Sequence, residues 1–276
     1  MDCILKIKSS VHGHTKYCNH SDIEPEWLVI KAKEMGFKEF TISEHIPYEK
    51  DSPYRPTMKV WNDVLYKKLV ELQEKYNDDD FKLFISIESE YFKKDHQFYF
   101  DFFNKYNLDF AIFGNHHYGS NLEQQIEFTD VFKDCYEATK CYVKQAIDGF
   151  KSNLFIHLAH PDFMIRMYNF WDHRIEKLYK KLIKKAIKYN ISLGFNVNGY
   201  YSKNKTNPPD EYYYPVKKFW DLVKNTKAKV RIECDIHHVK LLDASLINNC
   251  YDYAIELGLK NNLIDEINLP IKNKKI

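Results

Sequence analysis

Short apolar runs alternate along the chain with longer segments in which apolar and polar positions repeat at the spacing of an amphipathic helix. Such runs between turn residues are typical of buried strands, and their alternation with helices is typical of βα units around a parallel sheet. The pattern therefore predicts an α/β fold. The predicted strands are a first one that leads into His12, followed by 37–43, 81–87, 109–114, 153–158, 191–197 and 229–234.

The longer amphipathic segments predict helices between these strands. Pro25 suits the first turn of the first helix, where no amide donor is needed, and Gly36 suits the left-handed residue after its end. No low-complexity linker or domain boundary interrupts the series, so we expect residues 1–276 to form one domain, a closed or nearly closed barrel, with a loosely packed tail from about Leu259. The predicted helices cover 25–35, 59–76, 130–150, 173–189, 210–225 and 243–257.

Histidine and acidic side chains follow most of the predicted strands directly. In a barrel of parallel strands, the carboxyl ends of all strands meet at one face, so these side chains are expected to lie close together. Neutral imidazoles and carboxylates are ligands of divalent transition metals. The sequence therefore predicts a multinuclear metal centre at that face. The clusters are His12 with His14, His45, Glu88, Asn115 to His117, His160, and Asp235 with His237.

Two of these clusters have the same internal spacing. His12 and His14 are two residues apart, as are Asp235 and His237, and side chains two apart on a strand point to the same side. Glu88 follows an apolar strand, and its two carboxylate oxygens allow it to bridge two cations. Each motif is weak alone, because a single histidine or glutamate at such a place is more often a surface or core residue.

The remaining histidines have simpler interpretations. His96 and His173 lie away from the strand ends and are expected to be exposed. His157 lies inside a strand, where we expect a hydrogen-bonded core histidine. His117 and His238 each neighbour a better candidate and are expected to point away from it.

Composition and net charge limit the kinds of partner that the protein is expected to bind. The chain has 41 Lys and Arg against 39 Asp and Glu, a formal net charge of +2, which gives no reason to expect a nucleic acid partner. Lysines such as Lys180, Lys181, Lys184 and Lys185 are interpreted as a solvated helix face.

The six cysteines lack a CxxC pair and are interpreted as reduced thiols. With no signal peptide and no membrane-length apolar run, the sequence predicts a cytoplasmic protein without a membrane partner.

Taken together, the motifs resemble the PHP (polymerase and histidinol phosphatase) superfamily, and within it the histidinol-phosphate phosphatase branch. The resemblance extends over essentially the whole chain. The matching elements are the HxH pair with a third histidine in the next loop (His12, His14, His20), Glu44-His45-Ile46-Pro47, Glu88, the stretch from Asp109 to His116, His160-Pro161-Asp162, and Asp235 with His237.

The chain departs from the family pattern at two places. Val11 stands before the first histidine, where many members carry an acidic residue that supports a ligand. Asn115-His116-His117 replaces a small or apolar residue and a single histidine, so the ligand there is His116 or His117. The spacing from Asp109 favours His116.

The resemblance implies a distorted (β/α)7 TIM-like barrel of the PHP type in a single domain, with a trinuclear metal site. The ions would be divalent Zn, Fe or Mn, since these suit imidazole and carboxylate ligands. One ion would be held by His12, His14, Glu88 and Asp235, a second by Glu88, His116 and His160, and a third by His20, His45 and His237.

The activity that the resemblance implies is hydrolysis of L-histidinol phosphate to L-histidinol and phosphate, in histidine biosynthesis, by attack of a metal-bridging hydroxide. His237 or Asp162 could protonate the leaving alkoxide, while Glu88 bridges two ions. Arg166 and Arg55 are candidates for binding the phosphate, because a guanidinium pairs with two phosphoryl oxygens.

Other functions remain open at this point. They are a PHP phosphoesterase that acts on another small phosphate ester, a PHP nuclease, and a metal-binding protein without catalysis. The balanced charge counts against the nuclease, because binding to a nucleic acid backbone needs clustered cations.

Overall fold

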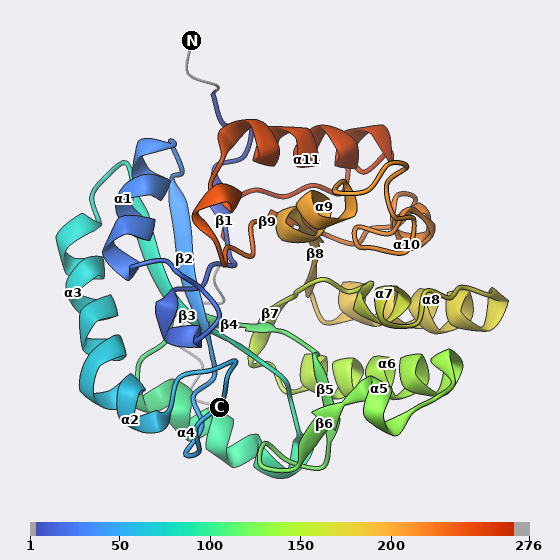
Figure 1. Cartoon of the computed structure of the whole chain (residues 1–276), viewed down its shortest axis with the longest axis horizontal. Coiled ribbons are helices and arrows are strands. Elements are labelled where there is room, and N and C mark those ends of the chain that lie inside the picture. The colour runs from blue at the N-terminus through green and yellow to red at the C-terminus, as the bar shows by residue number, and fades with distance from the viewer. Residues whose placement is uncertain (1–3, 268–276) are drawn as a thin grey trace.

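The computed structural model describes residues 4–267. Within this range, seven parallel strands form one sheet in the order β1-β2-β3-β4-β7-β8-β9, which is the order of the chain (Figure 1). The strands are β1 (Ser9–Ser10), β2 (Glu39–His45), β3 (Lys82–Ser89), β4 (Phe110–Phe113), β7 (Phe155–Leu158), β8 (Ser192–Asn196) and β9 (Val230–Glu233).

The sheet curves until its first and last strands meet. Beyond the ends of β1 and β9, Gly13 and Ile236 form a parallel bridge. The amide of His14 donates to the carbonyl of Ile236 at 3.0 Å, and the amide of Asp235 donates to the carbonyl of His12 at 3.0 Å. The predicted α/β fold is therefore confirmed as a nearly closed seven-stranded barrel.

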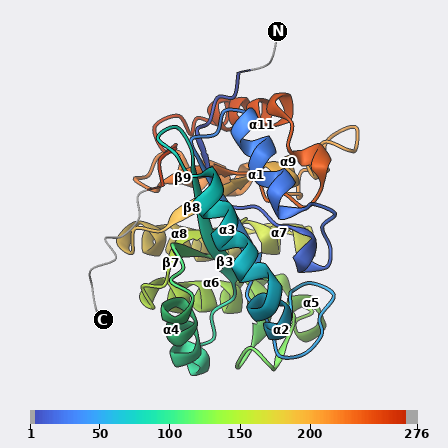
Figure 2. The same cartoon turned by 90° about the vertical axis from the view of Figure 1, so that its left-hand side faces the viewer.

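Helices form the outer layer of the barrel, with α1 and α3 on the side opposite α6 and α8 (Figures 1 and 2). Helix α8 shows why they pack in this way, because Ile175, Tyr179 and Leu182 on one face are fully buried while its lysines face outward. The main helices of this layer are α1 (Pro25–Glu34), α3 (Tyr66–Tyr76), α4 (His96–Lys105), α6 (Cys135–Lys151), α8 (His173–Lys188), α10 (Lys217–Val223) and α11 (Ala244–Glu256).

Shorter elements occupy the connections between these strands and helices. They include the β5–β6 hairpin, which no apolar pattern in the sequence indicated. The short elements are η1 (Lys16–Cys18), α2 (Met58–Val60), the π-helical turn η2 (Trp61–Leu65), η3 (Lys93–Asp95), β5 (His117–Gly119), β6 (Gln125–Glu127), α5 (Phe128–Val131), α7 (Phe163–Tyr168), α9 (Val197–Lys203) and η4 (Val239–Leu241).

The short helices α7 and α9 were not predicted, and three other helices also differ from the sequence prediction. Helix α4 was not predicted, because its segment is rich in aromatic residues, which are weak helix formers. The predicted helix 130–150 is interrupted, since α6 begins only after Asp134, whose side chain accepts a hydrogen bond from the amide of Glu137. The predicted helix 210–225 begins at Lys217, because Pro215 lacks an amide donor and restricts the residue before it.

The segment from Leu259 to Ile267 is packed rather than loose, which corrects the expectation for this part of the tail. Leu259 is fully buried, and the carbonyl of Asn262 accepts a hydrogen bond from the amide of Val230 at 2.9 Å. The carboxylate of Asp265 accepts hydrogen bonds from the amides of Lys8 and Ser9, at the start of β1. Residues 268–276 lie outside the described residues. Over 4–267, the helices are all too short or too polar to cross a membrane.

Candidate metal centre

Most histidines at the carboxyl ends of the strands line one cavity in the mouth of the barrel, and the fully buried His12 and His14 lie beside Glu88. The cavity has a volume of about 390 Å³. It is lined by side chains from almost every strand end, together with residues of α7, α9 and the β5–β6 hairpin. The lining includes His20, His45, Glu88, His116, His160, Asp235 and His237, with Arg55, Arg166 and Glu127 at its walls.

One group of four ligand atoms lies around the ends of β1 and β9. The Nε2 atoms of His12 and His14 are 2.9 Å apart, and each lies close to Glu88 Oε2, at 3.2 and 3.3 Å. Asp235 Oδ1 is 3.5 and 3.7 Å from the same two nitrogens. Ligand atoms bound at 2.0–2.1 Å to a tetrahedral ion lie about 3.3 Å apart. The four side chains can therefore hold one ion without rearrangement of the backbone.

A second group uses the other oxygen of Glu88. His116 Nε2 and His160 Nε2 are 3.2 Å apart, and they lie 3.5 and 3.4 Å from Glu88 Oε1. Glu88 Oε1 is buried and makes no hydrogen bond within the described part of the chain. The two carboxylate oxygens thus face two separate sets of imidazole nitrogens, which is the arrangement a bridging ligand requires.

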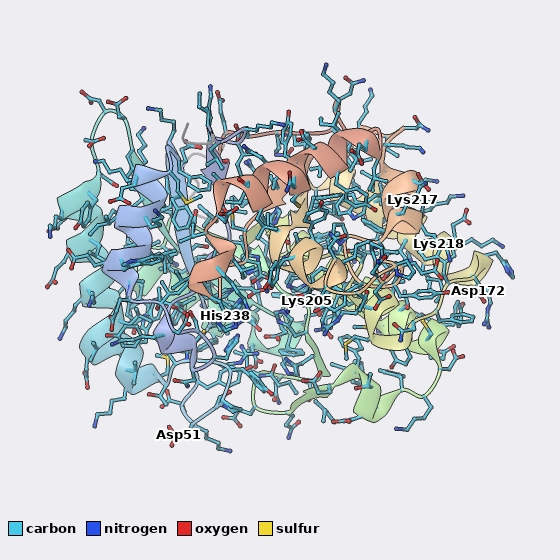
Figure 3. The ribbon with its side chains drawn as sticks, turned by 45° about the horizontal axis from the view of Figure 1, so that its top comes forward. Asp51, Asp172, Lys205, Lys217, Lys218 and His238 are labelled. Atoms are coloured by element: carbon cyan, nitrogen blue, oxygen red, sulfur yellow. The ribbon has the colours of Figure 1, made fainter. Side chains whose placement is uncertain are left out.

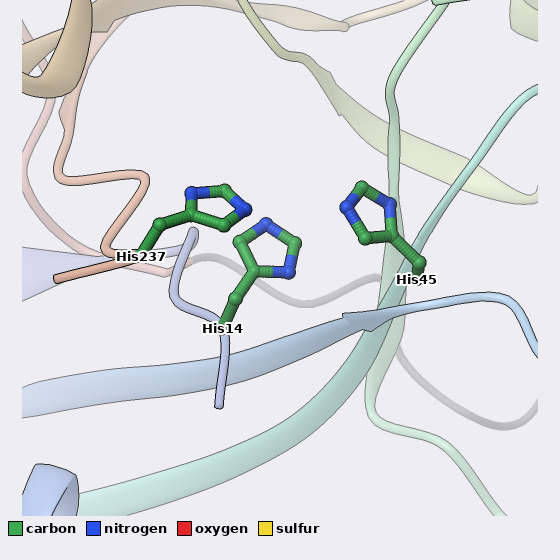
Figure 4. A group of neighbouring side chains, drawn as sticks. All are labelled: His14, His45 and His237. Carbon is green, nitrogen blue, oxygen red and sulfur yellow. The ribbon is translucent and has the colours of Figure 1, made fainter. Parts of the chain in front are cut away.

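The remaining rings stack around His14. Figure 4 shows His14 between His45 and His237, and its ring centroid is 4.5 and 4.2 Å from theirs. These three side chains offer ring nitrogens within 4.8 Å of one another. His20 lies 4.5 Å from His237 between ring centroids, and its closest ligand group includes Cys18 and His237. The predicted third set of His20, His45 and His237 is therefore near but is not one compact group, because His14 lies within it.

Glu233 supports this cluster, although no motif in the sequence assigned it a role. Its Oε2 accepts from His12 Nδ1 at 3.0 Å and from His157 Nε2 at 2.8 Å. Its Oε1 accepts from the backbone amide of His160 at 2.9 Å and from Asn196 Nδ2 at 3.0 Å. Glu233 thereby fixes the ring of His12 and the backbone at His160, as residues behind metal ligands commonly do. Its position two residues before Asp235, on the same side of the strand, was the available signal.

Glycines make room for the two buried glutamates. A Cβ at Gly114 would lie 2.1 Å from Glu88 Oε1, and a Cβ at Gly194 would lie 2.2 Å from Glu233 Oε1. Any larger side chain at either glycine would displace a carboxylate. The glycines at these strand positions are therefore part of the construction of the site.

The electrostatics of the cluster favour added positive charge. Burial disfavours ionisation of Glu88, but His12, His116 and His45 around it hold its pKa well below the usual range. Burial also opposes protonation of His12, yet the carboxylates of Glu88 and Asp235 raise its pKa well above the usual value. Buried carboxylates that stay ionised, beside imidazole nitrogens that face them, fit the donor set of a divalent cation.

His117 points away from this cluster, to a row of alternating charges. Its Nδ1 is 2.8 Å from Glu90 Oε1 and its Nε2 is 3.2 Å from Glu127 Oε1. Burial opposes protonation of His117, but hydrogen bonds to Glu127 and Glu90 raise its pKa to about 9. Arg55 lies at the far end of the row, with Nη2 3.0 Å from Glu90 Oε2. Of the adjacent histidines, His116 is the one that contacts Glu88.

The two candidate arginines lie in different surroundings. Arg55 is buried, paired with Glu90, and stacked on Tyr48 at 4.3 Å from the ring centroid. Arg166, on α7, lies over the ring of Tyr213 at 4.3 Å and has no carboxylate partner within residues 4–267. Arg166 therefore offers its guanidinium to a ligand in the cavity, whereas Nη2 of Arg55 is already engaged by Glu90.

Asp162 is not brought to the cavity. Its carboxylate is buried and accepts hydrogen bonds from the amide of Val216 at 2.6 Å and from Trp220 Nε1 at 3.2 Å. The geometry therefore assigns Asp162 to packing of the loop before α10, and this corrects the expectation that it could donate a proton to a leaving group. Burial raises the pKa of Asp162 to about 6.

The simpler interpretations of the other histidines agree with the structure. His157 is fully buried and hydrogen-bonded to Ser192 and Glu233, so the prediction of a core histidine is confirmed. His96 and His173 are exposed, as predicted. His238, labelled in Figure 3, lies at the rim of the cavity before η4 with half of its side chain exposed.

The fold and the cluster together define a (β/α)7 barrel whose mouth gathers side chains that can hold divalent metal. Residues 10–198 match the model of the PHP domain family, and the chain belongs to this family. Asp235 and His237 lie beyond the matched range.

Relatives with this fold are similar along most of the chain. The chain is 24% identical over 261 residues to the probable histidinol-phosphatase of Schizosaccharomyces pombe, covering 83% of this chain and 80% of that protein. The hisK structure from Listeria monocytogenes has a TM-score of 0.69 at 20% identity, covering 85% of this chain and 97% of that one. Histidinol phosphate phosphatase from Lactococcus lactis, solved with zinc, L-histidinol and phosphate, has a TM-score of 0.68 at 16% identity, covering 91% and 94%.

Proposed function

We propose that this chain is a metal-dependent phosphomonoesterase that hydrolyses L-histidinol phosphate to L-histidinol and phosphate in histidine biosynthesis. The observation that carries the proposal is the convergence of imidazole and carboxylate groups on both oxygens of Glu88 within one open cavity. The Lactococcus lactis neighbour, which was solved with zinc, L-histidinol and phosphate, supports the choice of substrate.

The proposed centre holds three divalent ions, of Zn, Fe or Mn. The fit rests on the ligand distances and on the buried oxygen Glu88 Oε1, which has no hydrogen-bond partner among residues 4–267. His14 lies so close to the third set that it could contribute there as well. The proposed ligands are His12, His14, Glu88 and Asp235 for the first ion, Glu88, His116 and His160 for the second, and His20, His45 and His237 for the third.

Bound divalent ions would supply a nucleophilic water at neutral pH and withdraw charge from the phosphoryl oxygens. The protein fixes the geometry in which this chemistry can occur. Glu88 holds the two imidazole sets at a constant separation, and Glu233 prevents rotation of His12. The backbone amide of His160 donates a hydrogen bond to Glu233, which also holds His12. This contact connects the second set of ligands with the first.

The proposed phosphate clamp is Arg166, because it lines the cavity and keeps its donors free of carboxylates. Arg55 is retained as a weaker contributor through Nη1, which is buried and makes no hydrogen bond within the described residues. Of the two residues considered for protonation of the leaving alkoxide, only His237 lines the cavity. A ring nitrogen of His237 that holds an ion cannot also hold a proton, so its two nitrogens would have to divide these roles.

A phosphate-release assay tests the proposal directly. The purified protein, supplied with Mn or Zn, is compared on L-histidinol phosphate, a panel of sugar phosphates and single-stranded DNA. We expect the highest kcat/KM on L-histidinol phosphate and no cleavage of DNA. A higher kcat/KM on a sugar phosphate would instead make the chain a phosphoesterase for another small ester, and release of nucleotides would make it a nuclease.

A further inference from the structure

The β5–β6 hairpin brings one more carboxylate to the cavity. His117 on β5 and Glu127 on β6 are directly opposite each other in the hairpin. Glu127 lines the same cavity as Glu88, His116 and His160, and 44% of its side chain is exposed. The hairpin therefore positions an accessible carboxylate beside the proposed metal centre.

The position of Glu127 is fixed by a series of contacts through His117, Glu90 and Arg55. Its Oε1 is 3.2 Å from His117 Nε2, and the other nitrogen of this ring is held by Glu90 at 2.8 Å. Glu90 is in turn held by Arg55. No hydrogen bond or ion pair occupies Glu127 Oε2 within residues 4–267. One oxygen is thus anchored by a buried row of alternating charges, and the other stays available to a ligand.

The charges around the cavity single out Glu127. The acidic side chains that line it are Glu88, Asp235 and Glu127. Glu88 and Asp235 belong to the cluster of proposed metal ligands, which leaves Glu127 as the carboxylate that faces the rest of a bound molecule. A carboxylate of this kind pairs with a cationic nitrogen through a charge-assisted hydrogen bond.

We propose that Glu127 binds the ammonium group of the substrate and gives the enzyme its preference for phosphate esters that carry an amine near the phosphate. This inference rests on the proposed function. His116 contacts Glu88 and the next residue, His117, contacts Glu127, so two consecutive residues connect the proposed metal centre with Glu127. The amine of L-histidinol phosphate is protonated at neutral pH and lies on the carbon next to the one that bears the phosphate ester.

The test compares ester pairs that differ only in the cation. O-phosphoethanolamine is paired with propyl phosphate, and L-histidinol phosphate with its analogue lacking the amine. For Glu127→Gln, which keeps the shape of the side chain, we expect the ratio of kcat/KM between the amine ester and its partner to fall about 10- to 100-fold, mainly through KM. The kcat/KM values of the amine-free esters should stay unchanged.

Two further variants control the comparison. Glu123→Gln removes an exposed carboxylate from the turn of the same hairpin, away from the cavity lining, and should leave the ratio unchanged. Glu127→Asp keeps the charge on a shorter side chain and should retain part of the preference.

The outcomes separate this inference from the proposed function. An unchanged ratio in Glu127→Gln would overturn the role of Glu127, as would an equal loss on both members of each pair, which would indicate a structural role. A wild-type enzyme that hydrolyses all four esters without preferring the amines would overturn this inference alone. A wild-type enzyme that releases phosphate from none of them would overturn the proposed function as well.

Discussion

Asp109, at the amino end of a strand, accepts hydrogen bonds from amides, whereas Glu88, at the carboxyl end of a strand, faces imidazole rings. Asp109 Oδ2 accepts from the amide of Ile85 at 2.9 Å and from Gln73 Nε2 at 3.0 Å. Glu88 instead lies between imidazole nitrogens at 3.2–3.5 Å and leaves an oxygen without a hydrogen bond. The same type of side chain serves folding at one end of the barrel and ligand binding at the other.

The comparison has a physical basis. At the amino ends each acceptor meets a donor, which is what a stable fold requires of buried polar groups. At Glu88 a buried carboxylate lies among imidazole nitrogens and one of its oxygens has no hydrogen bond within residues 4–267, an arrangement that costs stability unless positive charge lies beside it. Local conflict of this kind is a mark of functional sites. Changes at the two ends should therefore have different consequences.

Removal of metal should have the largest effect. We expect the purified protein to hold roughly three equivalents of transition metal, because its proposed ligands are too many for one tetrahedral ion. Chelation should abolish phosphate release, and Mn or Zn should restore it. The free energy of unfolding should also fall, by about 3 kcal/mol or more for ions well above their dissociation constants. Elemental analysis and thermal melts measure both, and a stoichiometry of one ion or fewer after reconstitution would contradict the trinuclear site.

Replacement of the bridging carboxylate comes next. Glu88→Gln should lower kcat/KM roughly a thousandfold, because two metal sites lose a charged ligand at once. His20→Asn should have a smaller effect, because His20 lies at the edge of the cluster. Measurements of kcat/KM and of metal content in the two variants test whether Glu88→Gln has the larger effect. Comparable activities with unchanged metal content would show that Glu88 does not bridge.

The ion pair of Arg55 and Glu90 lies in the wall of the cavity. Replacing Arg55 tests whether this pair stabilises the fold, as the hydrogen bonds at the amino ends of the strands do. Arg55→Ala should lower the free energy of unfolding by about 3 kcal/mol, because it leaves the buried Glu90 without its guanidinium partner. Arg174→Ala breaks the exposed pair with Asp172 and should cost no more than about 1 kcal/mol. Denaturant unfolding of both variants gives the comparison. Small and equal losses of unfolding free energy in the two variants would show that Arg55 does not stabilise the fold.

Arg166 should affect kinetics rather than stability. Arg166→Ala should lower kcat/KM for L-histidinol phosphate about 10- to 100-fold with metal content unchanged, because a charge-assisted pair with the phosphate is lost. Arg166→Lys should recover only part of the activity, since an ammonium lacks the planar pair of donors. Steady-state assays decide the matter, and wild-type kinetics in Arg166→Ala would remove Arg166 from the phosphate site.

The smallest effect on the activity is expected at the amino end. Asp109→Ala removes the acceptor of the Ile85 amide and should lower the free energy of unfolding by about 1–3 kcal/mol. The kcat/KM value should stay at the wild-type level, because this side chain lies at the opposite end of the barrel from the cavity. A clear loss of kcat/KM in Asp109→Ala would show that side chains at the amino ends of the strands also contribute to catalysis.

Much of the architecture was predictable from the sequence, because strand polarity alone brings the carboxyl ends together. The apolar runs located the strands to within about two residues, and the side chains after them located the cavity. The spacing of His12 and His14 predicted that both point to the same side, whereas their grouping with Asp235 came from the resemblance to the PHP superfamily.

Other features depend on tertiary register and could not be read from local patterns. The role of Glu233 arises because β9 lies beside both β8 and the segment after β1, which only the closed barrel reveals. The grouping of His14 with His45 and His237 depends on how the loop after β1 crosses the mouth. The placement of Asp162 follows from a contact with Trp220, which is far away in the sequence. Helix α4 lacked a clear signal because aromatic residues favour helices only weakly.

The closure of the barrel through Gly13 and Ile236 has a consequence for biosynthesis. His12 and His14 leave the ribosome early, whereas Asp235 follows more than two hundred residues later. At typical rates of translation this delay is roughly ten to forty seconds. During that time the nascent chain can present imidazoles, but it cannot assemble the first proposed metal site. Loading of that site therefore has to wait for closure of the barrel, so that an ion bound there would also connect the first and last strands of the barrel.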